Sequence, residues 1–164
     1  MRVALALLVL VAAGCGSGVK AEERAGTGGV TLMLPSGWVS NAAADGAISD
    51  PVTRIVVSSG PLPHRRTACP IANYGPADDQ VALVVVEWAP AADVALGERP
   101  EQFTAANLPA EPGGIVCFAG AGGTVQFAEA GRNLGAYLLL GRQAPAGLAE
   151  DARSVLDSLR VEPG

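Results

Sequence analysis

Histidine is almost absent from this chain of 164 residues, and its scarcity limits the acid–base chemistry available. His64 is the only histidine, so a hydrolase built on serine, histidine and an acid would need His64 as its base. Ser36, Ser58 and Ser59 could supply a hydroxyl, but the Gly-x-Ser-x-Gly turn that presents a nucleophile in many hydrolases is missing. We therefore expect a domain without catalytic activity and keep an envelope hydrolase that uses His64 as an alternative.

Positive charge is also scarce. Lysine and arginine together number 11 against 16 acidic residues, which gives a formal net charge of -5, and Lys20 is the only lysine. The negative net charge of such a domain does not attract nucleic acid or an anionic lipid surface. Arginine in place of lysine, with abundant alanine, glycine, proline and valine, is typical of a GC-rich genome such as that of an actinobacterium.

The chain has three cysteines, and the first of them ends an apolar run. Residues 3–13 are continuously apolar but too few to span a bilayer, and small residues lead from Ala12 into Cys15. This arrangement resembles the lipobox of bacterial lipoproteins. The resemblance implies a signal peptide over residues 1–14, a diacylglycerol on the sulfur of Cys15 and a fatty acid such as palmitate on the new amine. It places the domain outside the cytoplasm, anchored to the cell membrane by lipid, whereas the alternative is an ordinary secretory signal that contains a cysteine.

The two remaining cysteines, Cys69 and Cys117, form an even pair in an exported and therefore oxidising context. A disulfide between them is the natural interpretation, with two buried free thiols or metal ligation as alternatives. Two thiolates without a nearby histidine make a poor zinc site, so we expect no metal and no cofactor.

The patterning predicts one α+β domain over residues 30–164, preceded by a flexible tether over residues 15–29. β-Branched and apolar runs predict about six strands, and residues 81–88 should form a central strand because they are continuously apolar. Apolar residues at i, i+4, i+7 and i+8 predict a C-terminal helix packed on one face of a mostly antiparallel sheet. The predicted strands are 30–34, 54–59, 81–88, 115–119, 124–128 and 134–140, with helices at 100–108 and 148–159, a hairpin turn at 120–123 and an edge strand at Val161.

A long segment between two of these strands, residues 60–80, carries four prolines and the one basic cluster of the domain, His64, Arg65 and Arg66. Adjacent arginines can bind a phosphate or carboxylate bidentately, so we expect a ligand site here if the domain has one. The alternative is a solvated loop face, or pairing of these arginines with Asp78 and Asp79 in the same segment.

Two short segments resemble the small PsbP-like lipoproteins of bacterial envelopes. These are residues 34–38, Leu-Pro-Ser-Gly-Trp, and residues 155–161, Val-Leu-Asp-Ser-Leu-Arg-Val. The resemblance implies an antiparallel sheet flanked by helices, and a binding or assembly role.

Together these features predict a lipid-anchored extracytoplasmic interaction or binding domain, with an envelope protein or a small amphiphile as its partner. The more specific alternative is a carrier of a small amphiphilic ligand, with a pocket between the sheet and the helix.

Overall fold

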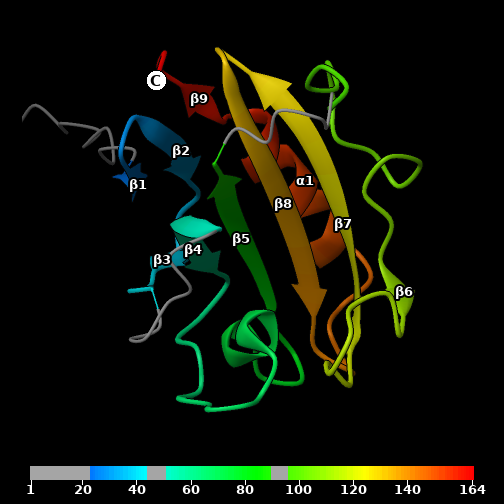
Figure 1. Cartoon of the computed structure of the whole chain (residues 1–164). Helices are drawn as coiled ribbons and strands as arrows, with labels where there is room; N and C mark the ends of the chain where they lie inside the picture. The colour runs from blue at the N-terminus through cyan, green and yellow to red at the C-terminus, as the bar shows by residue number, and fades with distance from the viewer. Residues whose placement is uncertain (1–22, 44–50, 90–95) are drawn as a thin grey trace, which may run out of the picture.

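The computed structural model describes residues 23–43, 51–89 and 96–164 (Figure 1). Cys15 and the predicted signal peptide lie outside these residues. No helix within the described ranges is long and apolar enough to cross a membrane. The elements in chain order are β1 Glu23–Thr27, β2 Val30–Leu34, β3 Val39–Ser40, β4 Val52–Ser58, the 3-10 helix η1 Pro70–Tyr74, β5 Val81–Trp88, β6 Glu111–Pro112, β7 Ala121–Glu129, β8 Arg132–Leu140, α1 Leu148–Asp157 and β9 Arg160–Val161.

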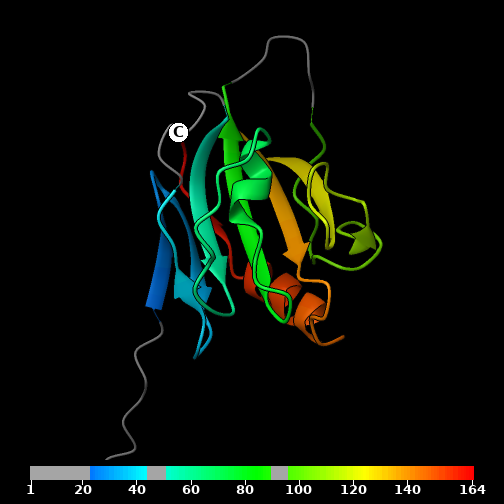
Figure 2. The same ribbon diagram turned by 90° about the horizontal axis from the view of Figure 1, so that it is seen from below.

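These strands form two antiparallel sheets, which confirms the predicted α+β class. The larger sheet has six strands in the order β3-β4-β5-β8-β7-β6, and the smaller has three in the order β1-β2-β9. The smaller sheet contacts β4, near the β3 edge of the larger one (Figure 2). The predicted closing strand at Val161 is confirmed, because β9 pairs with β2 through Val161 and Val30.

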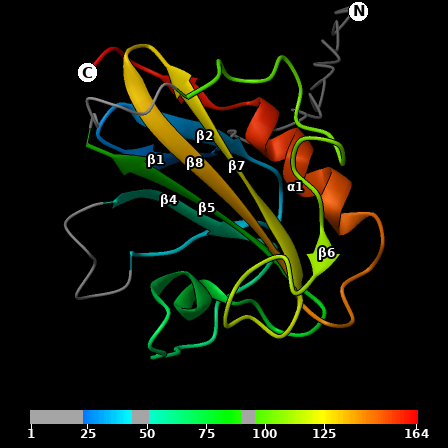
Figure 3. The ribbon, with the colours of Figure 1, turned by 45° about the vertical axis from the view of Figure 1, so that its right-hand side comes forward.

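Helix α1 covers one face of the larger sheet, while η1 lies over the opposite face (Figure 3). The apolar stripe of α1 packs into the main core together with side chains of β2, β5 and β8, and Leu156 is 0 % exposed there. The predicted C-terminal helix is confirmed. As the spacing of its apolar residues indicated, it buries one apolar stripe against the sheet.

Strand β5 is central, as its unbroken apolar sequence predicted. All residues from Val81 to Val86 are buried. Alternate side chains of β5 enter two different cores: Leu83 joins the main core under α1, and Val84 joins a second cluster on the other face. This second cluster is covered by Tyr74 of η1 and by Ile115.

The segment predicted as a tether is structured from Glu23 onward. Residues Glu23–Thr27 form β1 and pair with β2 in a hairpin, with Thr27 opposite Val30. The prediction failed because β1 is polar and exposed except at Ala25, so its sequence lacks the apolar alternation that marks a strand. Its backbone pairing with β2, rather than side-chain burial, holds it in place.

Residues 115–119 do not form the predicted strand, and Cys117 therefore does not lie in mid-strand. The chain turns there, with Cys117 at a positive φ of 63°. Ile115 and Phe118 pack on the second core cluster while Val116 is 77 % exposed, so burial follows the turn rather than the two-residue period of a strand.

The glycines at 120–123 do not make the predicted hairpin turn, because β7 begins at Ala121. A Cβ at Gly122 would clash with the carbonyl oxygen of Leu138, and one at Gly123 would clash with that of Pro109. These glycines allow the neighbouring backbone to approach the strand closely, which is the other common role of glycine in a sheet.

Residues 100–108 form turns rather than the predicted helix. Side chains satisfy the backbone there: Asn107 accepts from the Thr104 amide at 2.9 Å, and Asp157 of α1 accepts from the Phe103 amide at 2.8 Å. Phe103 and Leu108 are nevertheless buried in the main core, as their apolar character predicted.

A charged cluster that the sequence did not predict joins the two sheets. Glu87 of β5 accepts hydrogen bonds from Arg132 of β8 and Arg54 of β4, at 2.8 and 2.6 Å. Arg132 also donates to the carbonyl oxygen of Gly28, in the β1–β2 turn, at 2.7 Å. The hydrogen bond from Arg132, followed by that from Arg54, holds the pKa of Glu87 below its usual value against the opposing effect of burial.

Candidate functional site

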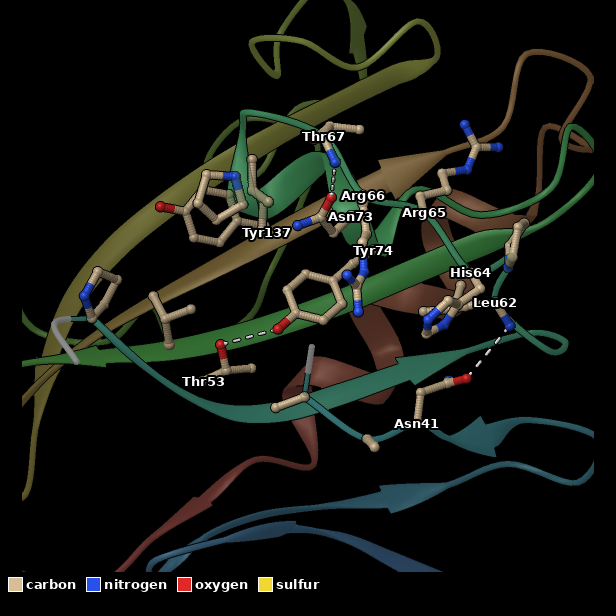
Figure 4. A pocket seen from close by; sticks show the side chains of 17 residues that line it. Asn41, Thr53, Leu62, His64, Arg65, Arg66, Thr67, Asn73, Tyr74 and Tyr137 are labelled. Atoms are coloured by element: carbon tan, nitrogen blue, oxygen red, sulfur yellow. Dashed lines mark hydrogen bonds between the residues drawn. The ribbon is translucent and has the colours of Figure 1, made fainter. Parts of the chain in front are cut away.

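A groove of about 890 Å³ lies on the face of the larger sheet opposite α1, between the sheet and the proline-rich loop at residues 60–80 (Figure 4). The loop and its 3-10 helix form one wall, and the strands form the floor. The lining residues are Asn41, Ala42, Ala43, Pro51, Thr53, Leu62, Pro63, His64, Arg65, Arg66, Thr67, Pro70, Ile71, Asn73, Tyr74, Val86 and Tyr137.

The floor comes from three neighbouring strands. Thr53 of β4 stands opposite Val86 of β5, and Val84 of β5 stands opposite Tyr137 of β8. Residues directly opposite one another across two strands share a face, so Thr53, Val86 and Tyr137 all point to the side away from α1. Burial raises the pKa of the Tyr137 phenol, a group that is uncharged at neutral pH.

The wall is set by η1. Pro70 begins the 3-10 helix, where its fixed φ suits the first turn, and the Gly75 amide closes the helix on the carbonyl oxygen of Ala72 at 3.2 Å. The helix directs Tyr74 down onto the floor, where its hydroxyl lies 3.4 Å from the Thr53 hydroxyl. The Tyr74 ring is thereby fixed in the middle of the groove (Figure 4).

Asn41 fixes the end of the groove that lies on the far side of Tyr74 from Thr53 (Figure 4). Its side-chain amide donates to the Ser58 hydroxyl at 2.9 Å, and its carbonyl oxygen accepts from the Leu62 amide at 3.4 Å. Asn41 therefore fixes the start of the proline-rich loop against β4. This contact places His64 at the same end of the groove (Figure 4).

The three basic residues singled out from the sequence all line the groove, and all three are exposed. Arg65 points away from Tyr74 in Figure 4 and donates to the carbonyl oxygen of Pro76 at 3.4 Å. Arg66 extends toward Tyr74. Their ligand-binding role stays a prediction, but their position on one groove is a feature of the structure.

The alternative pairing of these arginines with Asp78 is not what the structure shows. Asp78 instead accepts from Arg142 at 3.0 and 2.6 Å, and this hydrogen bonding lowers the pKa of Asp78. Within the described ranges, neither Arg65 nor Arg66 forms an ion pair. Arg65 nevertheless bonds to Pro76 and lies close enough to Asp78 to lower the pKa of that carboxyl, so Arg66 is the arginine whose charge has no described carboxylate beside it.

The predicted disulfide between Cys69 and Cys117 is confirmed, with a Cα–Cα separation of 6.2 Å. Cys69 lies directly before η1, between the groove residues Thr67 and Pro70. The bond therefore fastens one wall of the groove to the turn at residues 113–118.

Two of the three serines that could serve a hydrolase, Ser58 and Ser59, have structural partners. The Ser58 hydroxyl donates to the carbonyl oxygen of Gly60, and the Ser59 hydroxyl accepts from the Val81 amide at 3.1 Å. Neither hydroxyl bonds to His64 among the residues the structure describes. The same residues contain no group of three or more histidine, cysteine or acidic side chains that could hold a metal ion.

Sequence reasoning identified the loop but not the groove. It missed Asn41, Thr53 and Tyr74, although an aromatic residue in a proline-rich segment is a signal that could have pointed to Tyr74. It also placed a pocket between sheet and helix, whereas that interface is filled by the main core and the groove lies on the other face.

The two segments that resemble PsbP-like lipoproteins lie on neighbouring elements, because α1 packs against β2. The turn at residues 35–38 follows β2, and the Trp38 amide donates to the carbonyl oxygen of Pro35 at 3.1 Å. The helix-ending segment lies beside the same strand, where the Ser158 hydroxyl accepts from the Met33 amide at 2.9 Å.

Comparison of the chain with protein-family models, with curated proteins and with solved structures finds no match.

Proposed function

We propose that this protein is a lipid-anchored extracytoplasmic binding domain without catalytic activity, and that it binds a small amphiphilic molecule in the groove beneath the proline-rich loop. The groove is the observation that carries the proposal. Its volume of about 890 Å³ falls within the range of about 300–1,000 Å³ typical of small-molecule sites.

The lining supports a ligand with an apolar body. Val86, Ile71 and Leu62 present aliphatic surface, and the ring of Tyr74 adds a flat face between them. Isolated polar groups such as Thr53 can fix the orientation of a ligand, which is how small-molecule sites usually combine affinity with selectivity.

The absence of catalysis is supported by how the polar groups are used. Ser58 is buried and bonded to Asn41 and Gly60, so its hydroxyl helps to build the wall of the groove. His64 is exposed at the rim, without a partner in the described ranges that would orient its imidazole as a base.

A bulky residue on the floor should close the groove. We expect Thr53→Trp to weaken binding of the neutral fluorescent probe N-phenyl-1-naphthylamine at least tenfold, because the indole would occupy the space beside Val86 and Tyr74. Fluorescence titration of the purified protein measures the effect.

Val52→Trp is the matched control, because Val52 is exposed and neighbouring strand residues point to opposite faces. It should leave probe binding unchanged. Equal affinity in the wild type and both variants would contradict the proposed groove.

The lipid anchor is a separate part of the proposal. Cys15→Ser should abolish metabolic labelling with a fatty-acid analogue and release the domain from the membrane fraction, because the cysteine sulfur accepts the diacylglycerol. Gel fluorescence of the labelled chain gives the result, with Ser17→Ala as the control. Equal labelling of the wild type and Cys15→Ser would refute the anchor and leave the groove unaffected.

A further inference from the structure

We propose that the groove selects an anionic amphiphile, with a phosphate or carboxylate head beside Arg66 and His64 and the apolar body beyond Tyr74. This inference rests on the proposed function and adds to it the charge and the direction of the ligand.

The groove has two chemically different ends (Figure 4). Thr53 and Tyr137 lie on one side of the Tyr74 ring, while Asn41 and His64 lie on the other. Because Val86 stands opposite Thr53 across the sheet, the first end has an apolar floor with a neutral phenol. We name these the apolar end and the basic end.

Among the residues that the structure describes, no carboxylate faces the charge of the basic end. No aspartate or glutamate is among the described residues that line the groove. Five arginines of the described chain are paired with carboxylates: Arg54, Arg99, Arg132, Arg142 and Arg153. Arg66 has no such partner in the described ranges although the chain has a net charge of -5, so these residues of the groove present positive charge on an acidic protein.

The geometry of the arginine pair separates their roles. Arg65 is held by the carbonyl oxygen of Pro76 and lies close enough to Asp78 to lower its pKa, though less than Arg142 does. Arg66 extends toward Tyr74, between the two ends of the groove. Arg66 is therefore the side chain placed to contact a head group whose body lies on the apolar end.

Neither end of the groove should bind a ligand tightly without the other. The basic end is exposed, where water and salt compete with an ion pair and leave it weak. Apolar burial supplies the larger part of the affinity, and the guanidinium selects among apolar ligands by forming a charge-assisted hydrogen bond with an anionic head. The free anion should therefore bind poorly, and the amphiphile should bind well.

Three probes separate these contributions. Dodecyl phosphate carries both features, 1-monododecanoyl glycerol has the same chain length with a neutral head, and inorganic phosphate has only the anion. Isothermal titration of the full chain carrying Cys15→Ser, with each lipid below its critical micelle concentration, keeps the anchor from competing for the site.

Arg66→Gln tests the head-group contact. We expect it to weaken dodecyl phosphate about tenfold and to change 1-monododecanoyl glycerol less than twofold, because only the charged head loses a partner. The matched control is Arg24→Gln, an exposed arginine of β1 outside the groove, which should leave both affinities unchanged.

The outcomes distinguish this inference from the proposed function. An unchanged affinity of Arg66→Gln for dodecyl phosphate, or an equal loss for both lipids, would overturn the anionic head while the groove stands. Inorganic phosphate binding as tightly as dodecyl phosphate would overturn the amphiphile and leave a simple anion site. If the Cys15→Ser chain with its groove unaltered binds neither lipid nor the neutral fluorescent probe, the proposed function itself is refuted.

Discussion

Replacing Cys69 and Cys117 together by serine should lower the free energy of unfolding by about 4 kcal/mol. The disulfide joins residues separated by 48 positions, and cross-linking a loop of that length removes a corresponding entropy from the unfolded chain. Urea denaturation of the oxidised wild type and the double variant measures the difference.

Loss of the disulfide should loosen the wall of the groove before it loosens the rest of the fold. The disulfide fastens the segment before η1, while Tyr74 and Leu62 still hold the loop through the second core cluster. In the double variant we therefore expect faster amide hydrogen exchange in residues 63–73 than in β5, whose ladders lie at the centre of the larger sheet.

Reduction of the wild type provides the matched control. A reductant should bring the wild type to the stability of the double variant and leave the double variant unchanged. Alkylation of the exported protein without reductant should label neither Cys69 nor Cys117, and reduction should expose both. A double variant within about 1 kcal/mol of the oxidised wild type would show that the apolar contacts of the loop, rather than the cross-link, hold the groove wall.

The elements that could be predicted from the sequence are those in which apolar side chains are buried and polar side chains are exposed. The unbroken apolar run of β5 required cover on both faces, and α1 on one side and η1 on the other supply it. The stripe on residues 148–159 required one buried face, and the main core takes it. In these elements the hydrophobic pattern and the tertiary environment agree.

Prediction failed where backbone geometry rather than apolar pattern decides the structure. Strand β1 is held by pairing with β2, which a polar sequence does not reveal. The apolar run at 115–119 looks like a strand, yet it turns at Cys117 because Ile115 and Phe118 both reach the second core cluster. Gly122 and Gly123 look like a turn, yet their missing Cβ atoms admit a neighbouring segment against β7.

The candidate site was predictable in composition and not in shape. The basic cluster at residues 64–66 was visible because positive charge is rare in the chain. The groove itself depends on η1 folding back so that Tyr74 meets Thr53, and on Asn41 fixing Leu62. These contacts join residues 21 positions apart, and no local pattern encodes them.

Leu156→Ala should destabilise the domain by about 2–5 kcal/mol. Leu156 is 0 % exposed in the main core, so the substitution removes buried methyl groups and leaves a cavity that the surrounding β2, β5 and β8 side chains fill only in part. Ser154→Ala, at an exposed position of the same helix, is the matched control and should change stability by less than about 0.5 kcal/mol.

The helix and the groove lie on opposite faces of the larger sheet, so stability and binding should separate in this variant. Under conditions where Leu156→Ala remains folded, it should bind N-phenyl-1-naphthylamine as tightly as the wild type does. A urea midpoint equal to that of the wild type would mean that α1 contributes little to the core. A folded variant that loses probe binding would instead place the apolar ligand between helix and sheet, because only that interface is altered by the substitution.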